Sequence, residues 1–153
     1  MQTTTLGRTG IEVTAAGLGC GGFSRIGIDR GLGHAAGIVR AAYDSGVNFF
    51  DTAYVYGTQE AVGRGLAGVI RDKYVLSSKF PYRDMDGRRA TPEEASRYLD
   101  ESLRLLNTDY IDVWHIHALN AEDYEWAKSA LLPVMYSARE SGKIRFLGAT
   151  EQF

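Results

Sequence analysis

The fold is decided by the stretch Asn48-Phe49-Phe50-Asp51-Thr52-Ala53-Tyr54-Val55-Tyr56-Gly57. It begins as an apolar strand, runs directly into an acid, a hydroxyl and two tyrosines, and ends at a glycine before a predicted helix. In parallel α/β proteins, active sites lie at the carboxyl ends of strands. An acid at a strand end, with a tyrosine five positions later, therefore indicates a scaffold that presents chemical groups.

Strands and helices alternate on both sides of this stretch. A hairpin is predicted over 3–13, with its turn at 7–10, followed by strands over 15–20, 47–51, 74–79, 110–117 and 144–149. Helices are predicted over 34–45, 58–66, 91–107 and 132–141, and loops over 21–33, 81–90 and 118–128. Thr91-Pro92-Glu93-Glu94 is typical of a capped helix start. This alternation predicts a parallel sheet, either open and doubly wound or part of a (β/α)8 barrel.

Length and composition limit the class of protein. The 153 residues suit a single domain over 1–153, with no linker inside it. The formal net charge of −2 gives no indication of nucleic acid or an anionic membrane as a partner. Cys20 is the only cysteine, so an internal disulfide is excluded. With no signal peptide and no long apolar run, we expect a cytoplasmic protein.

Four polar residues follow the predicted strands at equivalent places: Asp51, Tyr56, Lys79 and His117. If the strands are parallel neighbours, all four lie on one rim. A lysine cation favours the tyrosinate form of a nearby tyrosine, and an aspartate can neutralise that lysine when both are buried. A histidine beside them can donate to a substrate oxygen. Together they could protonate an oxyanion as it develops on a carbonyl, although a buried ion pair with a structural tyrosine and histidine has the same pattern.

Five segments carry a family resemblance, in order along the chain: Leu6-Gly7-Arg8-Thr9-Gly10 with Gly17-Leu18-Gly19, Asp51-Thr-Ala-Tyr-Val-Tyr56-Gly57, Ser77-Ser78-Lys79, Tyr110-Ile-Asp-Val-Trp-His-Ile-His117, and Gly142-Lys143-Ile144-Arg145-Phe146-Leu147-Gly148. In these segments the chain resembles the aldo-keto reductase family over essentially its whole length. The resemblance implies a (β/α)8 barrel that uses NADPH, without a metal, to reduce a small aldehyde or ketone.

The resemblance also implies roles for particular residues. Tyr56 would be the proton donor, Lys79 and Asp51 the pair that assists it, and His117 the group that orients the carbonyl. The implied cofactor-binding positions are Gly19, Cys20, Asp51, Thr150 and Glu151.

The chain departs from the family pattern in length and at one motif. A typical barrel needs about 250 residues, and the match ends just after the fifth barrel strand. The family's serine–asparagine pair after that strand is replaced by Thr150-Glu151. We therefore expect the first five strands of a barrel with a hairpin before them, and self-association through the open edges. An inactive fragment and a regulatory or binding subunit of the same fold are the alternatives.

Other residues have competing interpretations. Tyr54 competes with Tyr56 as the proton donor, and Cys20 is more simply a buried thiol than a nucleophile. His115 and His117, two apart in a strand, share a face and could bind a metal with Asp51 in a hydrolase. The aromatic candidates for a substrate wall are Phe23, Tyr54, Tyr82 and Trp126. An open flavodoxin-like module is the rival fold.

Overall fold

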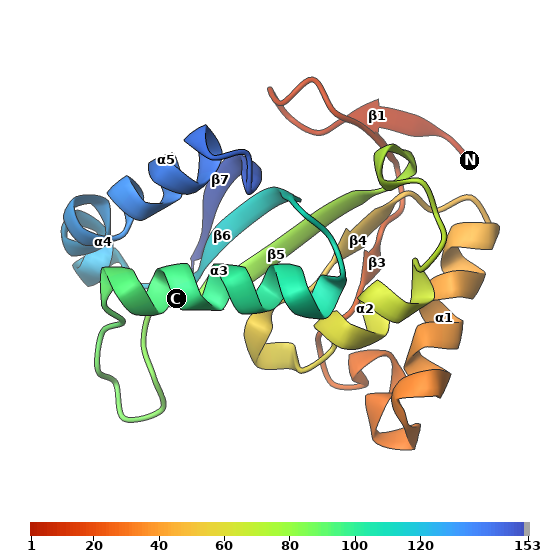
Figure 1. Ribbon diagram of the computed structural model, residues 1–153, viewed down its shortest axis with the longest axis horizontal. Helices are drawn as coiled ribbons and strands as arrows, with labels where there is room; N and C mark the ends of the chain where they lie inside the picture. The colour runs from red at the N-terminus through yellow and green to blue at the C-terminus, as the bar shows by residue number, and fades with distance from the viewer. Residues whose placement is uncertain (152–153) are drawn as a thin grey trace.

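Five parallel strands form one sheet in the computed structural model, which describes residues 1–151 (Figure 1). The strands pair in the order of the sequence: β3 (Leu18–Gly19), β4 (Phe49–Asp51), β5 (Val75–Pro81), β6 (Ile111–Leu119) and β7 (Ile144–Glu151). This unbroken sequential order is that of a (β/α) barrel and not of a doubly wound sheet, where the order reverses at a switch point. The predicted barrel-type fold, here containing five strands, is confirmed, and the flavodoxin-like alternative is wrong.

Each crossover between neighbouring strands contains helical segments. The α-helices are α1 (Leu32–Asp44), α2 (Gln59–Gly65), α3 (Pro92–Leu106), α4 (Tyr124–Ala130) and α5 (Leu132–Glu140). The 3-10 helices are η1 (Arg25–Arg30), η2 (Tyr54–Tyr56), η3 (Arg71–Lys73) and η4 (Ala121–Asp123). Figure 1 shows α3 across the sheet, between α2 and the α4–α5 pair. The single domain predicted over 1–153 remains a prediction, and residues 152–153 lie outside the described residues.

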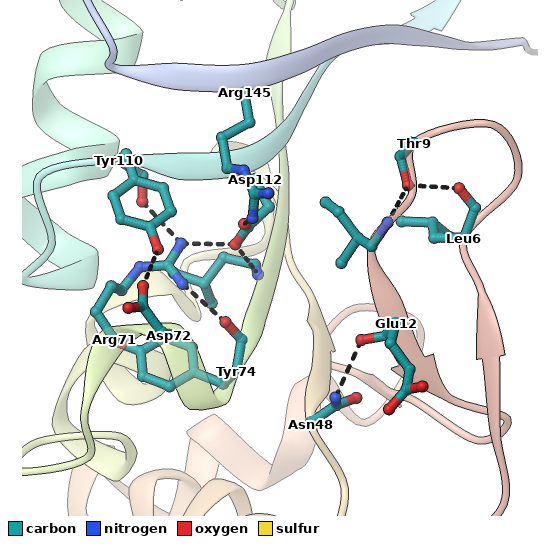
Figure 2. A network of polar contacts seen from close by, with 12 residues as sticks. Leu6, Thr9, Glu12, Asn48, Arg71, Asp72, Tyr74, Tyr110, Asp112 and Arg145 are labelled. Atoms are coloured by element: carbon teal, nitrogen blue, oxygen red, sulfur yellow. Dashed lines mark hydrogen bonds and ion pairs between the residues drawn. The ribbon is translucent and has the colours of Figure 1, made fainter.

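The N-terminal hairpin is confirmed as β1 (Thr3–Thr5) and β2 (Glu12–Thr14), paired antiparallel. Ile11 and Val13 pack with Val75 in a small second core, so the hairpin lies against the beginning of β5. Asn48 anchors it, because its side-chain amide donates to the Glu12 carbonyl at 3.3 Å (Figure 2). The same side chain accepts from the Thr14 amide at 2.7 Å.

The amino ends of β5 and β6 are held together by an arginine. The Arg71 guanidinium donates to the Tyr74 and Tyr110 carbonyls at 2.8 and 3.0 Å, and to the Asp112 carboxylate at 2.6 Å (Figure 2). Its central carbon lies 3.8 Å from the centroid of the Tyr110 ring. Asp112 is buried and also accepts from Arg145 of β7 at 2.8 Å. Three neighbouring strands are therefore fastened at the rim opposite to their carboxyl ends.

Helix α3 has the predicted start. Thr91 accepts from the Glu94 amide at 3.2 Å, while the Glu94 carboxylate accepts from the Thr91 amide at 2.8 Å, and Pro92 is the first helical residue. The helix ends at Asn107, which adopts a left-handed conformation. This reciprocal capping box fixes the beginning of the helix. The helix packs on the outside of the sheet, where the Phe80 and Trp114 rings stack 4.2 Å apart.

Three segments differ from the predictions. The strand expected over 15–20 pairs only at Leu18–Gly19, because the chain first turns at Thr14, whose hydroxyl donates to the Ala16 carbonyl at 2.7 Å. The loop expected over 21–33 contains η1 and the first turn of α1, and the loop over 118–128 contains η4 and most of α4. The helices η1, η4 and α4, of 6, 3 and 7 residues, are too short to show a helical period in the sequence.

Two glycines of α2 allow close helix packing. A Cβ atom at Gly63 would lie 2.6 Å from the Leu105 carbonyl oxygen of α3, and one at Gly65 would lie 2.7 Å from the Ala36 carbonyl oxygen of α1. Cβ atoms in proteins essentially never approach backbone atoms this closely, so a side chain at either position would force the helices apart. The glycines that make α2 intrinsically weak therefore let it fit between its two neighbours.

We expect Gly63→Ala to lower the free energy of unfolding by about 1–3 kcal/mol, because the added methyl group forces α2 away from α3. Gly37→Ala is the matched control in α1, where no atom lies within 4 Å of the added Cβ. That substitution should raise stability by about 0.5–1 kcal/mol, the usual helix-propensity gain. Urea titration of both variants tests the pair, and a stabilising Gly63→Ala would contradict the packing argument.

Candidate active site

An ion pair between a buried lysine and a partly exposed aspartate joins the carboxyl ends of β4 and β5. The Lys79 ammonium donates to the two Asp51 carboxylate oxygens at 2.8 and 2.7 Å and to the Thr52 carbonyl at 2.9 Å. The register of the sheet explains this contact. Asp51 lies directly opposite Ser77, and Lys79, two residues further along β5, projects on the same face. All three ammonium protons have partners, and Lys79 is only 7% exposed.

Tyr56 lies beside this pair. It ends the short helix η2, which Gly57 closes in a left-handed conformation, so its ring turns back over the rim. The Lys79 nitrogen lies 5.1 Å from the centroid of the Tyr56 ring. The ring also covers Gly21, where any Cβ atom would collide with it. The sequence predicted position 21 only as part of a loop. The contact with the Tyr56 ring explains why this position needs a residue without a side chain.

His117 comes from the end of β6. Its Nε2 lies 3.5 Å from the Tyr56 hydroxyl, and the two rings meet edge to face. Burial lowers the pKa of His117, and the Lys79 cation lowers it further against the opposing effect of Asp51. At neutral pH the imidazole is therefore neutral. Three segments that are separate in the sequence thus bring Asp51 with Tyr56, Lys79 and His117 together on one rim.

Tyr54 points to a different place. Its hydroxyl donates to the Glu101 carboxylate of α3 at 2.7 Å, and its ring packs against Tyr98. This hydrogen bond, together with some burial, raises the pKa of Tyr54 to about 12. Tyr54 is therefore tied to the outer helix, and the geometry favours Tyr56 as the rim tyrosine.

The predicted cofactor residues of β3 lie next to Asp51. Gly19 is opposite Asp51 in the sheet register, and the Cys20 amide donates to the Asp51 carbonyl at 2.7 Å. Cys20 is fully buried, and burial, together with Asp51, raises the pKa of its thiol to about 12. A thiol in this state is not a nucleophile at neutral pH.

Thr150 and Glu151 are the last described residues of β7. The Thr150 hydroxyl oxygen accepts from the Ala118 amide at 2.7 Å, which leaves its proton free to donate. Ala118 has a positive φ of 54° at the bulge where β6 and β7 lose register. Thr150 therefore fixes the backbone immediately after His117.

The two histidines of β6, which are the ligands of the alternative metal site, have different partners. His115 directs its Nε2 to the Ser77 hydroxyl at 3.2 Å, whereas the Nε2 of His117 faces Tyr56. Over residues 1–151 no group of three or more histidine, cysteine, aspartate or glutamate side chains is arranged to hold a metal ion. The geometry therefore gives no support to the hydrolase alternative.

The loops beyond β5 and β6 are joined by a residue that the sequence did not single out. Asp123 is fully buried and accepts from the Tyr82 hydroxyl at 2.9 Å, from Arg83 at 2.6 Å and from Arg89. Tyr82 is thus a buried structural residue, and Trp126 lies beneath the Arg89 guanidinium. Of the four aromatic candidates for a substrate wall, Phe23 alone is fully exposed.

Three residues at the carboxyl ends of β3 and β7 have the chemical groups that the carboxamide and ring of a nicotinamide cofactor would need. A carboxamide has an oxygen that accepts and an NH2 group that donates. Thr150 has a free hydroxyl proton for the oxygen, and the Glu151 carboxylate can accept from the NH2 group. Gly19 has no atom within 4 Å of a Cβ position, so its backbone is open to a flat ring.

The sheet and its rim define a barrel of the (β/α)8 class, of which the described residues provide five strands. The chain belongs to the aldo/keto reductase family, because the model of that family matches residues 27–152. Members of this family are oxidoreductases of carbonyl compounds and generally use NAD(P)H.

Relatives match along almost the whole chain. L-galactose dehydrogenase of Arabidopsis thaliana is 31% identical over 155 residues, which cover 98% of this chain and 48% of that protein. 6-dehydroglucose reductase of Novosphingobium aromaticivorans is 32% identical over 164 residues, which cover 95% of this chain and 50% of that protein. The chain therefore spans about half the length of the curated relatives it matches.

Solved structures give the same fold. An aldo-keto reductase from Bacillus halodurans in its holo form superposes with a TM-score of 0.82 at 24% identity, covering 99% of this chain and 50% of that one. A thermostable aldo-keto reductase in complex with the inhibitor epalrestat gives a TM-score of 0.78 at 29% identity, covering 97% of this chain and 53% of that one. Within residues 1–151, no helix is long and apolar enough to cross a membrane.

Proposed function

We propose that this chain carries the catalytic groups of an NADPH-dependent oxidoreductase that reduces a small aldehyde or ketone to an alcohol. The observation that carries the proposal is the convergence on one rim of the Lys79–Asp51 ion pair, the Tyr56 hydroxyl and the His117 imidazole. Two relatives, named as a dehydrogenase and a reductase, support the same class of reaction.

The Tyr56 hydroxyl is the proton donor in this proposal. It lies 3.5 Å from His117 Nε2, so a single carbonyl oxygen can contact both groups. Because the pKa of His117 is lowered, the neutral imidazole orients that oxygen by a hydrogen bond and leaves the proton transfer to Tyr56. The Lys79 ammonium is paired with Asp51 and lies beside the Tyr56 ring, so its positive charge is near the negative charge that develops on the tyrosine oxygen.

The cofactor would be held by Gly19, Cys20, Asp51, Thr150 and Glu151, and when bound it supplies the hydride. This chain's own contribution is to position the carbonyl carbon and to provide the proton. Preorganised donors at the carbonyl oxygen, here the half-buried Tyr56 and His117, stabilise the charge that develops there.

The two outer strands of the sheet have unpaired edges in the described residues. In the described residues β3 and β7 each pair on one side only. Ile144 is the only fully buried residue of β7, whereas β5 is buried at six of its seven positions. We propose that this chain, on its own in solution, covers these edges by self-association, since unpaired strand edges favour pairing with another chain.

NADPH fluorescence titration of the purified chain tests the proposal, with the mass in solution measured on the same sample. We expect micromolar binding by an oligomer, followed by carbonyl-dependent oxidation of NADPH. A folded monomer that binds no NADPH would contradict both parts and favour the alternative of a non-catalytic subunit. Repeating the titration with NADH measures the preference between the two cofactors.

A further inference from the structure

Outside the four proposed catalytic positions, a serine contacts the ion pair and a histidine contacts that serine. The Ser77 hydroxyl donates to Asp51 Oδ1 at 2.7 Å, the same oxygen that accepts from Lys79 at 2.8 Å. The Ser77 oxygen in turn lies 3.2 Å from His115 Nε2. Ser77 is opposite Asp51 across β4 and β5, and His115 is opposite Lys79 across β5 and β6. The sheet register therefore places the two residues beside the ion pair.

The direction of these hydrogen bonds follows from counting protons. A serine hydroxyl has one proton, and an ionised aspartate can only accept. Because Ser77 donates its proton to Asp51, its oxygen must accept from His115 through an Nε2–H group. The three groups then form a directed chain, from His115 to Ser77 to Asp51.

The surroundings keep His115 in this form. Burial lowers the pKa of His115 to about 4, with a further lowering by Lys79 and His117 and an opposing effect from Asp51. The neutral ring then has its proton on Nε2 and a lone pair on Nδ1. That Nδ1 atom is buried with no hydrogen-bond partner among residues 1–151. A Cβ atom at Gly148 would lie 2.5 Å from it, so the glycine of β7 gives the ring its space.

We infer that Ser77 and His115 are positioning residues, which orient the Asp51 carboxylate so that it holds the Lys79 ammonium beside the Tyr56 ring. Asp51 is partly exposed, with 35% of its side chain accessible, so burial alone does not fix its rotation. The hydrogen bond from Ser77, the third to this carboxylate, removes this freedom, and Ser77 is itself fixed by His115. The inference rests on the proposed function only for its effect on turnover, because the geometry of the ion pair can be measured without a substrate.

The test compares two adjacent serines of β5. Ser77→Ala removes the donor to Asp51, whereas Ser78→Ala is the control, because Ser78 lies on the opposite face and accepts from Gln59 at 2.9 Å. Both serines are buried, so loss of either hydroxyl should cost a similar stability of about 1 kcal/mol. NMR of the ¹⁵N-labelled full chain records the Lys79 ammonium signal and the tautomer of the His115 ring.

Wild type and Ser78→Ala should give a sharp Lys79 ammonium signal and a single Nε2–H tautomer of His115. In Ser77→Ala the Lys79 ammonium signal should be broadened, and the His115 ring should be a mixture of its two neutral tautomers. If Ser77→Ala does not fold, His115→Leu removes the outer donor instead, and His115→Gln, whose amide can still donate to Ser77, should restore the Lys79 signal. Unchanged Lys79 and His115 signals on removal of the donor would overturn the inference.

In a preparation that reduces carbonyls, Ser77→Ala should lower kcat about tenfold or more and leave KM nearly unchanged, since a small displacement of a catalytic group slows the chemical step. Ser78→Ala should keep the wild-type kcat. If the wild-type chain shows neither NADPH binding nor turnover, the proposed function fails, while the NMR comparison still decides the positioning role.

Discussion

Replacing Tyr56 by phenylalanine should reduce carbonyl turnover by about two orders of magnitude or more, the effect expected for a lost general acid. The variant loses one hydroxyl group. Within residues 1–151 its one hydrogen-bond contact is the long one of 3.5 Å with His117, so the fold should not depend on it. The ring remains against Gly21 and near Lys79. Steady-state kinetics, with NADPH affinity measured separately, checks the prediction.

Tyr54→Phe is the matched control, because Tyr54 lies two residues away in the same short helix and loses the same atom. Its hydroxyl donates to Glu101, so this variant should lose about 1 kcal/mol of stability and keep its turnover. The opposite result, in which Tyr54→Phe is slow and Tyr56→Phe retains wild-type turnover, would transfer the proton-donor role to Tyr54.

The sequence was sufficient to locate the rim because strand geometry is local. Side chains alternate along a strand, and neighbouring parallel strands end on the same side of a sheet. Polar residues at the ends of three apolar runs could therefore be assigned to one rim: Asp51, Lys79 and His117. The beginning of α3 followed from Thr91-Pro92-Glu93-Glu94 for the same reason, since a capping box involves only four consecutive residues.

The contacts that the sequence did not reveal are all between distant segments. Ser77 reads as an ordinary strand residue until the register places it opposite Asp51. Asp123 reads as one acid in an acidic loop, and its two arginines precede it by 34 and 40 residues. Position 21 needs a glycine because of the Tyr56 ring, which comes 35 residues later in the sequence. Periodicity and capping contain no information about such pairs.

The two rims of the sheet have different charge arrangements. At the carboxyl ends, Lys79 is paired with an aspartate that remains partly exposed, so the charges are available to a ligand. At the amino ends, the carboxylate of Asp112 is 1% exposed and is shared by Arg71 and Arg145. In (β/α) barrels, residues at the carboxyl ends of strands contribute to chemistry and those at the amino ends to stability. This difference leads to a prediction about stability alone.

Asp112→Ala should lower the free energy of unfolding by about 3–5 kcal/mol, because removing one partner of a buried ion pair leaves the other charge without compensation. Arg71 would lose its carboxylate while its guanidinium stays packed on Tyr110 (Figure 2). The Leu76 amide, which donates to Asp112 at 2.9 Å, would also lose its acceptor. Domains are usually stable by about 5–15 kcal/mol, so this loss is a large fraction of the total.

Asp100→Ala is the control, since Asp100 forms an ion pair with Lys143 at 2.6 Å but is 60% exposed. Exposed pairs contribute about 0–1 kcal/mol, so this variant should unfold near the wild-type urea concentration. Asp112→Asn keeps an oxygen for the Leu76 amide and removes only the charge. Its unfolding midpoint should therefore lie between those of Asp112→Ala and Asp100→Ala. Equal unfolding midpoints for Asp112→Ala and Asp100→Ala would mean that Arg71 and Arg145 find water or other acceptors at this rim. The stability of the sheet would then have to come from the packing of its helices.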